Sequence, residues 1–330
     1  MPEKSAPRLW EQHCCLPLLP SADITELARY PLGSYLSVNV GYSLHSTADS
    51  LALLRRFRRE ALADGRFHLV ESFGDAWPAT PRDTLALAFD LEDSAPLGGD
   101  LDNVKVFYDL GVRSLLPAYN FANTAGGGCL DASDTGLTAY GRDLIRTLNE
   151  VGMFADGSHC AARTGLDIAA VTTAPMIYSH SNFAGVWAHP RNITDDQARA
   201  CAATGGVIGI NGVGIFLGHN GPDERAARVA AMADHIVYGV ELLGIDHIGI
   251  SSDFSFDGDQ FNQEIADNPE SFSAEFTRWG PIQWTPPEDL LGRSEVPGLD
   301  EILAGRGFSE TERAALFGGN FARVAARVWR

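Results

Sequence analysis

The amino-acid sequence predicts an α/β fold in which a parallel sheet closes into a (β/α)8 TIM barrel. Short apolar, β-branched runs alternate with amphipathic helical patterns along most of the 330 residues, which is typical of repeated βαβ units. The alternation continues without a linker, which favours one closed barrel over two domains. No Gly-x-Gly-x-x-Gly motif opens a helix after the first strand, so an open doubly wound sheet is the weaker alternative.

The elements can be followed in order along the chain. A first strand is predicted around "WEQHCC", and later strands lie within residues 84–93, 112–120, 153–159, 175–182, 206–214 and 247–254. Helical patterns lie between them, within residues 101–111, 136–152, 160–172, 193–205 and 223–244. "TDDQ" and "SETE" have the pattern of capped helix starts, and Leu-Gly and Thr-Gly pairs mark helix ends.

One domain is predicted over residues 1–330, with one interruption. The segment 255–305 breaks the strand–helix alternation and carries two of the six tryptophans. It is either a cap over one end of the barrel or a substrate lid, since long structured loops in compact domains often serve sites.

Charge and cysteine content exclude several classes of protein. The formal net charge is −18, from 25 basic and 43 acidic residues, so we expect no binding to nucleic acid or to anionic membranes. Five cysteines are an odd and sparse set, which argues against a disulfide framework. The start "MPEKSAPRLW" has no apolar stretch typical of a secretory signal, and no run is long enough to span a bilayer. We therefore expect a cytoplasmic protein.

Four predicted strand ends carry a metal ligand or an acid–base group, namely Glu92, His159, His180 and Asp253, and His13 lies at the end of the first strand. The C-terminal ends of barrel strands converge on one site. A lone histidine after a strand is usually structural, but its recurrence at equivalent places points to a ligand set. Imidazole and carboxylate groups gathered in this way predict a zinc-type hydrolytic centre.

Arg191 lies between a strand end and a helix cap in "HPRNITDDQ". A guanidinium fixed there can bind a carboxylate through two parallel hydrogen bonds. The alternative is a surface ion pair with Asp195 or Asp196.

Several segments, in order, resemble the renal (membrane) dipeptidase family, zinc peptidases of the metal-dependent amidohydrolase superfamily. They are "FYDLGVR", "GLTAYGRDLIRTLNEVGMFADGSH", "PMIYSHSN", "HPRNITDDQ", "GGVIGIN", "GIDHIGISSDFSFDG" and "GGNFARVAARVW". The resemblance covers nearly the whole chain and implies a (β/α)8 barrel that holds two zinc ions. By matching motif, His13 is similar to the family's first ligand, Glu92 to the bridging carboxylate, and His159 and His180 to the later pair.

The resemblance also implies roles in substrate binding and proton transfer. Arg191, followed by Asn192, is similar to the arginine that grips the C-terminal carboxylate of a dipeptide. Asp253 is similar to the aspartate that shuttles a proton beside the bridging water. A homodimer is the oligomer that the family implies.

Two positions depart from the family pattern. Cys15 stands where His-Asn-Asp-Leu-Pro supplies a carboxylate ligand, and Tyr119 stands where a histidine contacts the substrate carbonyl. Residues i and i+2 of a strand share a face, so His13 and Cys15 can reach one ion. The shorter cysteine side chain is offset by a zinc–sulfur bond of about 2.3 Å, against roughly 2.0–2.2 Å for oxygen. Alternatively, Cys15 does not ligate and the first metal position is weak or empty.

The sequence thus predicts a metallopeptidase that cleaves dipeptides or similar small amides with a free C-terminal carboxylate. Zn2+ is the expected cofactor, as one or two ions, with two implied by the resemblance. Tyr119 keeps a polar tip that can donate a hydrogen bond to the reacting carbonyl. The two departures leave a second hypothesis open, a metal-poor homologue that acts as a binding or scaffold protein. A redox role for Cys14 and Cys15 is disfavoured, because they lack Cys-x-x-Cys spacing.

Overall fold

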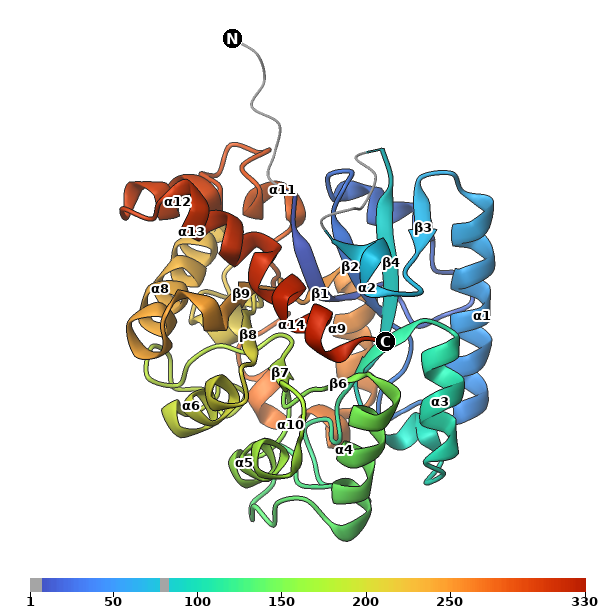
Figure 1. Ribbon diagram of the computed structural model, residues 1–330. Helices are drawn as coiled ribbons and strands as arrows, with labels where there is room; N and C mark the ends of the chain where they lie inside the picture. Colours follow the sequence, from blue (N-terminus) through green and yellow to red (C-terminus); the bar gives the residue numbers. More distant parts are fainter. Residues whose placement is uncertain (1–7, 78–82) are drawn as a thin grey trace.

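The computed structural model describes residues 8–77 and 83–330, and its strands form a ring enclosed by helices (Figure 1). Eight of the strands in the described residues make up the barrel. They are β1 (Trp10–Cys15), β2 (Tyr35–Asn39), β4 (Leu85–Leu91), β5 (Val112–Leu115), β6 (Phe154–Ala155), β7 (Ile177–Tyr178), β8 (Val207–Ile210) and β9 (Ile248–Ile250). The predicted strands are confirmed. Of the first ten residues, "MPEKSAPRLW", the structure describes those from Arg8 onward.

Every pair of neighbouring barrel strands that shares backbone hydrogen bonds is parallel. One run follows the order β1, β2, β4, β5, β6, a second follows β7, β8, β9, and a parallel bridge between Asp156 and Ile177 links the two. Two further strands are added to the first run: β3 (Phe67–Leu69) on β4, and β10 (Phe254–Ser255) on β1. Strand order and direction are those of the predicted barrel.

The Glu11 side chain connects β9 to β1. Its carboxylate accepts hydrogen bonds from the Ser251 hydroxyl (2.8 Å), the Ser252 amide (2.8 Å) and the Ser252 hydroxyl (2.6 Å). Tyr30 donates a fourth, at 2.9 Å. A fully buried carboxylate with four donors therefore joins the first and last barrel strands.

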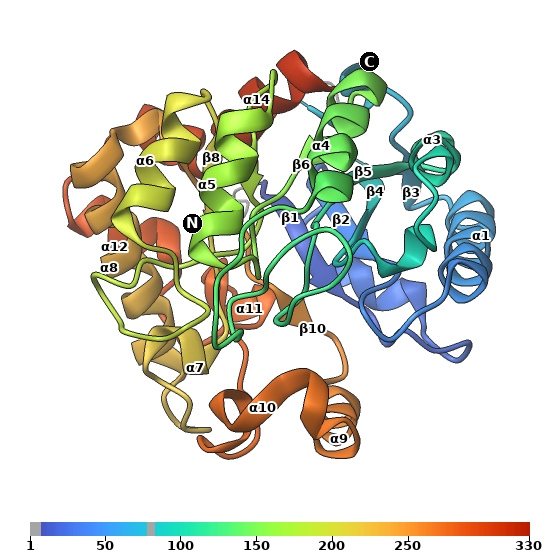
Figure 2. The same cartoon turned by 90° about the horizontal axis from the view of Figure 1, so that it is seen from below.

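The longer helices form the outer layer, seen end-on in Figure 2. They are α1 (Thr47–Ala63), α3 (Asp102–Asp109), α4 (Ala139–Val151), α5 (Ala162–Val171), α6 (Asp195–Ala203), α8 (Arg225–Leu243) and α14 (Asn320–Val328). Shorter elements connect them: η1 (Ile24–Arg29), α2 (Phe73–Ala76), η2 (Ala95–Leu97), α7 (Gly214–Leu217), η3 (Ile245–His247), α11 (Pro287–Leu290), α12 (Leu299–Gly305), α13 (Glu310–Ala314) and η4 (Ala315–Gly319). Both predicted caps form capping boxes, Thr194 with Gln197 and Ser309 with Glu312, which satisfy the first free amides of α6 and α13.

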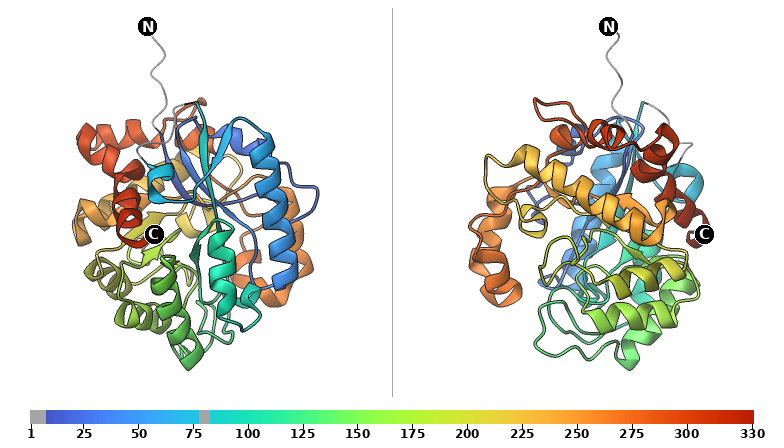
Figure 3. Two further views of the ribbon diagram at one scale, coloured as in Figure 1. Left: turned by 45° about the vertical axis from the view of Figure 1, so that its right-hand side comes forward. Right: turned by 90° about the vertical axis from the view of Figure 1, so that its left-hand side faces the viewer.

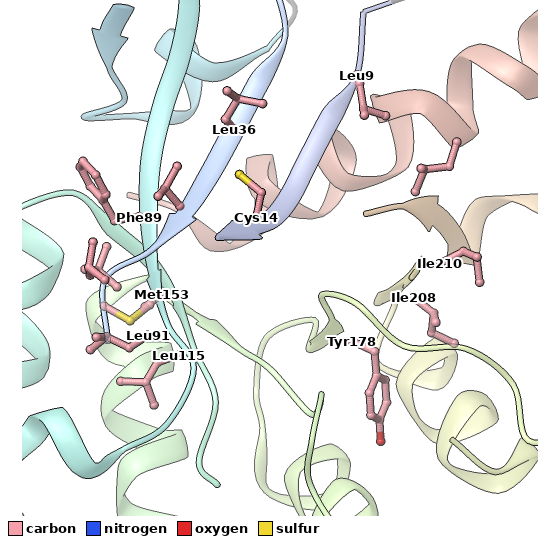
Figure 4. Close-up of a cluster of buried hydrophobic side chains, with 14 of the residues drawn as sticks. Leu9, Cys14, Leu36, Phe89, Leu91, Leu115, Met153, Tyr178, Ile208 and Ile210 are labelled. Carbon is pink, nitrogen blue, oxygen red and sulfur yellow. The ribbon is translucent and has the colours of Figure 1, made fainter. Parts of the chain in front are cut away.

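Alternation along β4 separates the two sides of the barrel wall. Leu87, Phe89 and their neighbours at odd positions join the large cluster between sheet and helices, part of which Figure 4 shows. Ala86 and Ala88 pack in the smaller cluster with Trp10 and Phe321. Glu92 continues this even-numbered, inward-facing series directly after the strand, because side chains alternate with a period of two.

The segment after β10 forms a helical flap. Its helices are α9 (Gly258–Asp267) and α10 (Pro269–Thr277), which project beyond the ring of helices in Figures 2 and 3. The predicted break in the strand–helix alternation therefore coincides with a separate helical layer. In the described residues, no helix combines the length and apolar character needed to cross a bilayer.

Candidate metal centre

A bulge in β1 turns His13 and Cys15 into the barrel. The β1–β2 register shifts between Glu11 and Cys14, so that Gln12 and His13 both make hydrogen bonds inside the barrel, to Ser114 and Asp90 respectively. Bulges commonly re-aim a side chain near a functional site. Cys15, two residues on, places its Sγ 3.4 Å from His13 Nε2. The predicted approach of these two side chains to a common point is therefore present.

Glu92 lies at the centre of the group. Asn39 Nδ2 donates to its Oε2 at 2.7 Å, which leaves Oε1 directed at three imidazoles. The Nε2 atoms of His159, His180 and His13 lie 3.0, 3.3 and 3.5 Å from that oxygen. One carboxylate oxygen thus faces three ring nitrogens that come from three different strands.

Hydrogen bonds to the other ring nitrogen orient each imidazole. Nδ1 of His13 pairs with Asp90 Oδ1 (2.9 Å), that of His159 with Asn120 Oδ1 (2.8 Å) and that of His180 with Ser179 Oγ (2.6 Å). Ser37 in turn donates to Asp90 Oδ2 at 2.7 Å. Such partners fix the tautomer and the direction of metal-binding histidines, so all three Nε2 atoms are available at the centre.

Asp253 completes the cluster. Its Oδ1 lies 3.6 Å from His13 Nε2, and its Oδ2 accepts a hydrogen bond from Asn211 at 2.8 Å. Asp253, His159 and Asn120 are three of the four non-glycine residues that have positive φ within 8–77 and 83–330, at 54°, 61° and 56°. Left-handed backbone is costly for such residues and is often found at functional sites.

Three overlapping sets of side chains can each hold an ion. They are His13–His180–Asp253, His13–Cys15–Glu92 and Glu92–His159–His180. Nitrogen, sulfur and carboxylate oxygen are the ligands that zinc prefers, and Glu92 is shared by two sets. His180 Nε2 is buried without a hydrogen-bond partner, which fits an atom that binds a cation.

The electrostatics favour the ligand-competent form of the two later histidines. Burial lowers the pKa of His159 and of His180 well below the usual value, and the nearby Arg191 lowers both further. Both rings are therefore neutral, as metal ligation requires. Burial raises the pKa of the Cys15 thiol to about 12, so the thiolate needs the charge of an adjacent ion to form near neutral pH.

A cavity opens onto one side of the cluster. The reactive end is formed by Cys15, Glu92, His159 and Asp253, and much of the remaining wall is aromatic. Tyr119 belongs to that wall, with its ring stacked 4.2 Å from the His159 ring. Burial raises the pKa of the Tyr119 hydroxyl well above its usual value, so Tyr119 remains a proton donor.

Arg191 and Asn192 lie beside the cluster but do not line this cavity. Arg191 is 2% exposed and donates to the Ser181 hydroxyl (3.0 Å) and the His180 carbonyl (2.9 Å), while its Nε has no partner. The alternative of a surface ion pair is wrong, because Asp195 and Asp196 pair with Arg199 instead. Asn192 donates to the Trp187 and Phe216 carbonyls and fixes the loop.

The sequence analysis missed the residues that support the ligands: Asn39, Asp90, Asn120 and Asn211. Only Asp90 carries a readable signal, since it precedes Glu92 by two residues and so shares its face of β4. The three asparagines come from other segments, and only the fold brings them to the ligands. All five cysteines are free, as expected.

Comparison with known proteins assigns this chain to the metallopeptidases, hydrolases that use a bound metal ion. The family model described as membrane dipeptidase (peptidase family M19) matches residues 29–272. The chain belongs to this family, and membership implies a metal ion at the cluster.

Two of the curated relatives each match most of this chain. A protein of Klebsiella pneumoniae named only as uncharacterized, in the pqqA 5' region, is 30% identical over 286 residues, or 85% of this chain and 95% of that one. An uncharacterized dipeptidase of Schizosaccharomyces pombe is 31% identical over 246 residues. The match covers 74% of this chain but only 53% of that relative's length.

Solved structures share the fold. An amidohydrolase from Pseudomonas aeruginosa superposes with a TM-score of 0.83 at 23% identity, covering 98% of this chain and 96% of that one. A metallo peptidase from Rhodobacter sphaeroides, liganded with a phosphinate mimic of the dipeptide L-Ala-D-Ala, gives 0.77 at 20% identity, covering 98% and 100%. At these identities the likeness establishes the barrel fold.

Proposed function

We propose that this protein is a zinc-dependent hydrolase of dipeptides or similar small amides with a free C-terminal carboxylate. The observation that carries the proposal is the position of Glu92 Oε1, within 3.5 Å of three imidazole nitrogens and shared by two ligand sets. A shared carboxylate oxygen of this kind fits a bridge between two ions.

The proposed centre would hold two zinc ions. His13 and Cys15 would bind the first, His159 and His180 the second, and Glu92 could serve either. The chemistry that zinc supplies is polarisation of the carbonyl and activation of water near neutral pH. Cys15 makes the first position softer than a carboxylate does and favours zinc over magnesium or manganese.

Three side chains carry the remaining steps. Asp253, held by Asn211, takes a proton from the attacking water and delivers it to the leaving amine. Tyr119 lines the cavity beside His159 and donates its hydroxyl proton in a hydrogen bond to the developing oxyanion. Arg191 lies beside the cluster and not in the cavity wall, and its buried positive charge attracts the substrate carboxylate from there.

The flap formed by α9 and α10 is proposed to close the cavity over the substrate. Residues of this segment, among them Phe261, Phe276 and Trp284, line the cavity. Exclusion of water by such a lid strengthens the electrostatic interactions inside. Residues 255–305 then belong to the same functional unit as the barrel.

The test is hydrolysis by zinc-loaded protein of a panel of dipeptides and N-acyl amino acids, with metal content measured on the same sample. We expect about two zinc ions per chain and turnover of at least one dipeptide series. Bound zinc with no turnover of any substrate contradicts the proposal. Absence of zinc under replete conditions supports instead a binding or scaffold protein with a metal-poor site.

A further inference from the structure

Glu264, on the flap, is an acidic residue of the cavity that the proposed mechanism does not use. It lines the same cavity as Glu92 and Asp253. Its carboxylate accepts hydrogen bonds from the Tyr42 hydroxyl and from Gln260 Nε2, the latter at 3.0 Å. A carboxylate has about four acceptor positions, so two remain for a ligand.

In the part of the chain that the structure describes, this carboxylate has no lysine or arginine partner. Among residues 8–77 and 83–330, none of the ion pairs includes Glu264, and no lysine or arginine lines the cavity. The chain nevertheless keeps an acidic group there in a largely aromatic wall. Glu264 is half-buried, and an apolar ligand that covered it would desolvate a charge with no cationic partner, so the carboxylate fits a cationic ligand better than an apolar one.

The aromatic wall around Glu264 is itself suited to a cation. Tyr42, Phe261 and Trp284 line the cavity with it, and Tyr42 binds it directly. Ring faces attract ammonium and guanidinium groups, most strongly where water is excluded. The carboxylate and the rings therefore select the same chemical class of ligand.

Glu264 lies at the end of the cavity away from the metal cluster. The Tyr42 ring is 5.0 Å from the Tyr119 ring, which is 4.2 Å from the ligand His159, so two aromatic rings separate Glu264 from that ligand. The α-ammonium of a dipeptide is only two bonds, roughly 2.5 Å, from the carbon under attack. That ammonium stays near the metal cluster, whereas a long side chain can reach Glu264.

The surface beyond Glu264 leaves room for such a chain. A second, more open groove borders the cavity and shares with it Leu18, Gln260 and Glu264. Glu264 thus lies at the junction of cavity and groove.

We propose that Glu264 is a specificity residue that binds a cationic side chain of the substrate, an ammonium or guanidinium as in lysine or arginine. The proposal rests on the proposed function, since it assigns the substrate class of the same cavity. Either the first or the second residue of a dipeptide can supply the cation, and the substrates below separate the two.

The experiment compares Lys-Ala and Ala-Lys with the uncharged norleucine analogues Nle-Ala and Ala-Nle, using zinc-loaded wild type and Glu264→Gln. The amide keeps polar atoms for Tyr42 and Gln260 but removes the charge. We expect the wild type to prefer one lysine dipeptide, and Glu264→Gln to lower that kcat/KM about tenfold or more while leaving the norleucine analogue nearly unchanged. There are two controls. Tyr42→Phe removes a hydrogen bond to Glu264 but keeps the carboxylate charge and the aromatic ring, and should keep the preference for the lysine dipeptide. Glu270→Gln removes an exposed flap charge outside the cavity and should change neither series.

A binding measurement keeps this proposal distinct from the proposed function. Lysine- and norleucine-containing phosphinate analogues are titrated calorimetrically into the same proteins. Selective binding of the lysine analogue that is lost in Glu264→Gln, without turnover of any dipeptide, supports the cation site and contradicts the hydrolase. Equal binding of both analogues, or no effect of Glu264→Gln on selectivity, overturns the cation site even when dipeptides are hydrolysed.

Discussion

At the scale of single residues, the centre depends on groups that hold its ligands as well as on the ligands. Asp90 is the clearest case, because its carboxylate pairs with His13 Nδ1 at 2.9 Å and is itself held by Ser37. This hydrogen bond directs His13 Nε2 to the cluster. It also makes the imidazole more basic, and so a stronger ligand for a metal ion. In the proposed metal centre, Asp90 would therefore act on the ion through His13.

We predict that Asp90→Asn weakens zinc binding about 10–100-fold with little change in the folded structure. An amide can still accept from His13 but does not supply the negative charge. Competition with a chromophoric chelator measures the affinity. Asp143→Asn, which alters an exposed aspartate on α4, is the matched control, and an unchanged affinity in Asp90→Asn refutes the role.

The sequence predicted the side chains that the structure brings together, because each is a reactive side chain at a recurring place in the alternation. Asn39, Asn120 and Asn211 could not be found in this way, since asparagine is common in loops and at turns for local reasons. The contact between Tyr42 and Glu264 was not predicted, because Glu264 of the flap meets Tyr42 of a barrel loop only in the folded chain. From the sequence we predicted that Arg191 binds a carboxylate. Its hydrogen bonds to Ser181 and His180 could not be predicted, because only the fold brings these groups together.

At the scale of elements, the junction between β9 and β1 is made by a side chain. In place of backbone hydrogen bonds between β9 and β1, the Glu11 carboxylate accepts four hydrogen bonds from Ser251, Ser252 and Tyr30. This junction could not be predicted from the sequence, because Glu11 has the pattern of an ordinary polar residue near His13. Its removal should loosen the strand that carries His13 and Cys15.

We predict that Glu11→Gln lowers the free energy of unfolding by about 2–4 kcal/mol, since an amide nitrogen replaces an acceptor among buried donors. Urea unfolding followed by circular dichroism measures it. The exposed Glu150→Gln should change stability by less than about 0.5 kcal/mol. A wild-type midpoint in Glu11→Gln would mean that the junction does not depend on this carboxylate.

At the scale of the whole molecule, alternation and capping predicted the order of strands and helices, and the register of the short strands could not be predicted. β6 and β7 are two residues long, too short to carry a period of their own. The barrel surrounds them with neighbours that supply the pairing. The fold class can therefore be predicted from the repeated pattern. The bulge in β1 that directs His13 into the barrel cannot be predicted in this way.

Stability should also fall in acid because of histidines buried away from the centre. Burial lowers the pKa of His235 to about 3, from 6.5. Between these values the unfolded chain binds a proton that the native chain does not, so this residue favours unfolding as the pH falls below 6.5. The effect is at most about 1.4 kcal/mol per pH unit.

We predict that His235→Asn makes the loss of stability between pH 6.5 and pH 4 shallower. Its side-chain oxygen can still accept the Phe183 amide that His235 Nδ1 accepts at 3.2 Å. Urea unfolding at several pH values measures the slope, with the exposed His219→Asn as control. Identical slopes in wild type and His235→Asn contradict the prediction.

We propose that Cys15 is a ligand of the metal centre and that Cys14 is not. Cys14 points away from the cluster, where its Sγ donates to the Ser37 carbonyl, while Cys15 Sγ lies 3.4 Å from His13 Nε2. X-ray absorption at the zinc edge of the loaded protein tests this claim directly. We predict a sulfur neighbour at about 2.3 Å that Cys14→Ala retains and Cys15→Ala loses. A first shell of nitrogen and oxygen alone in the wild type contradicts the claim.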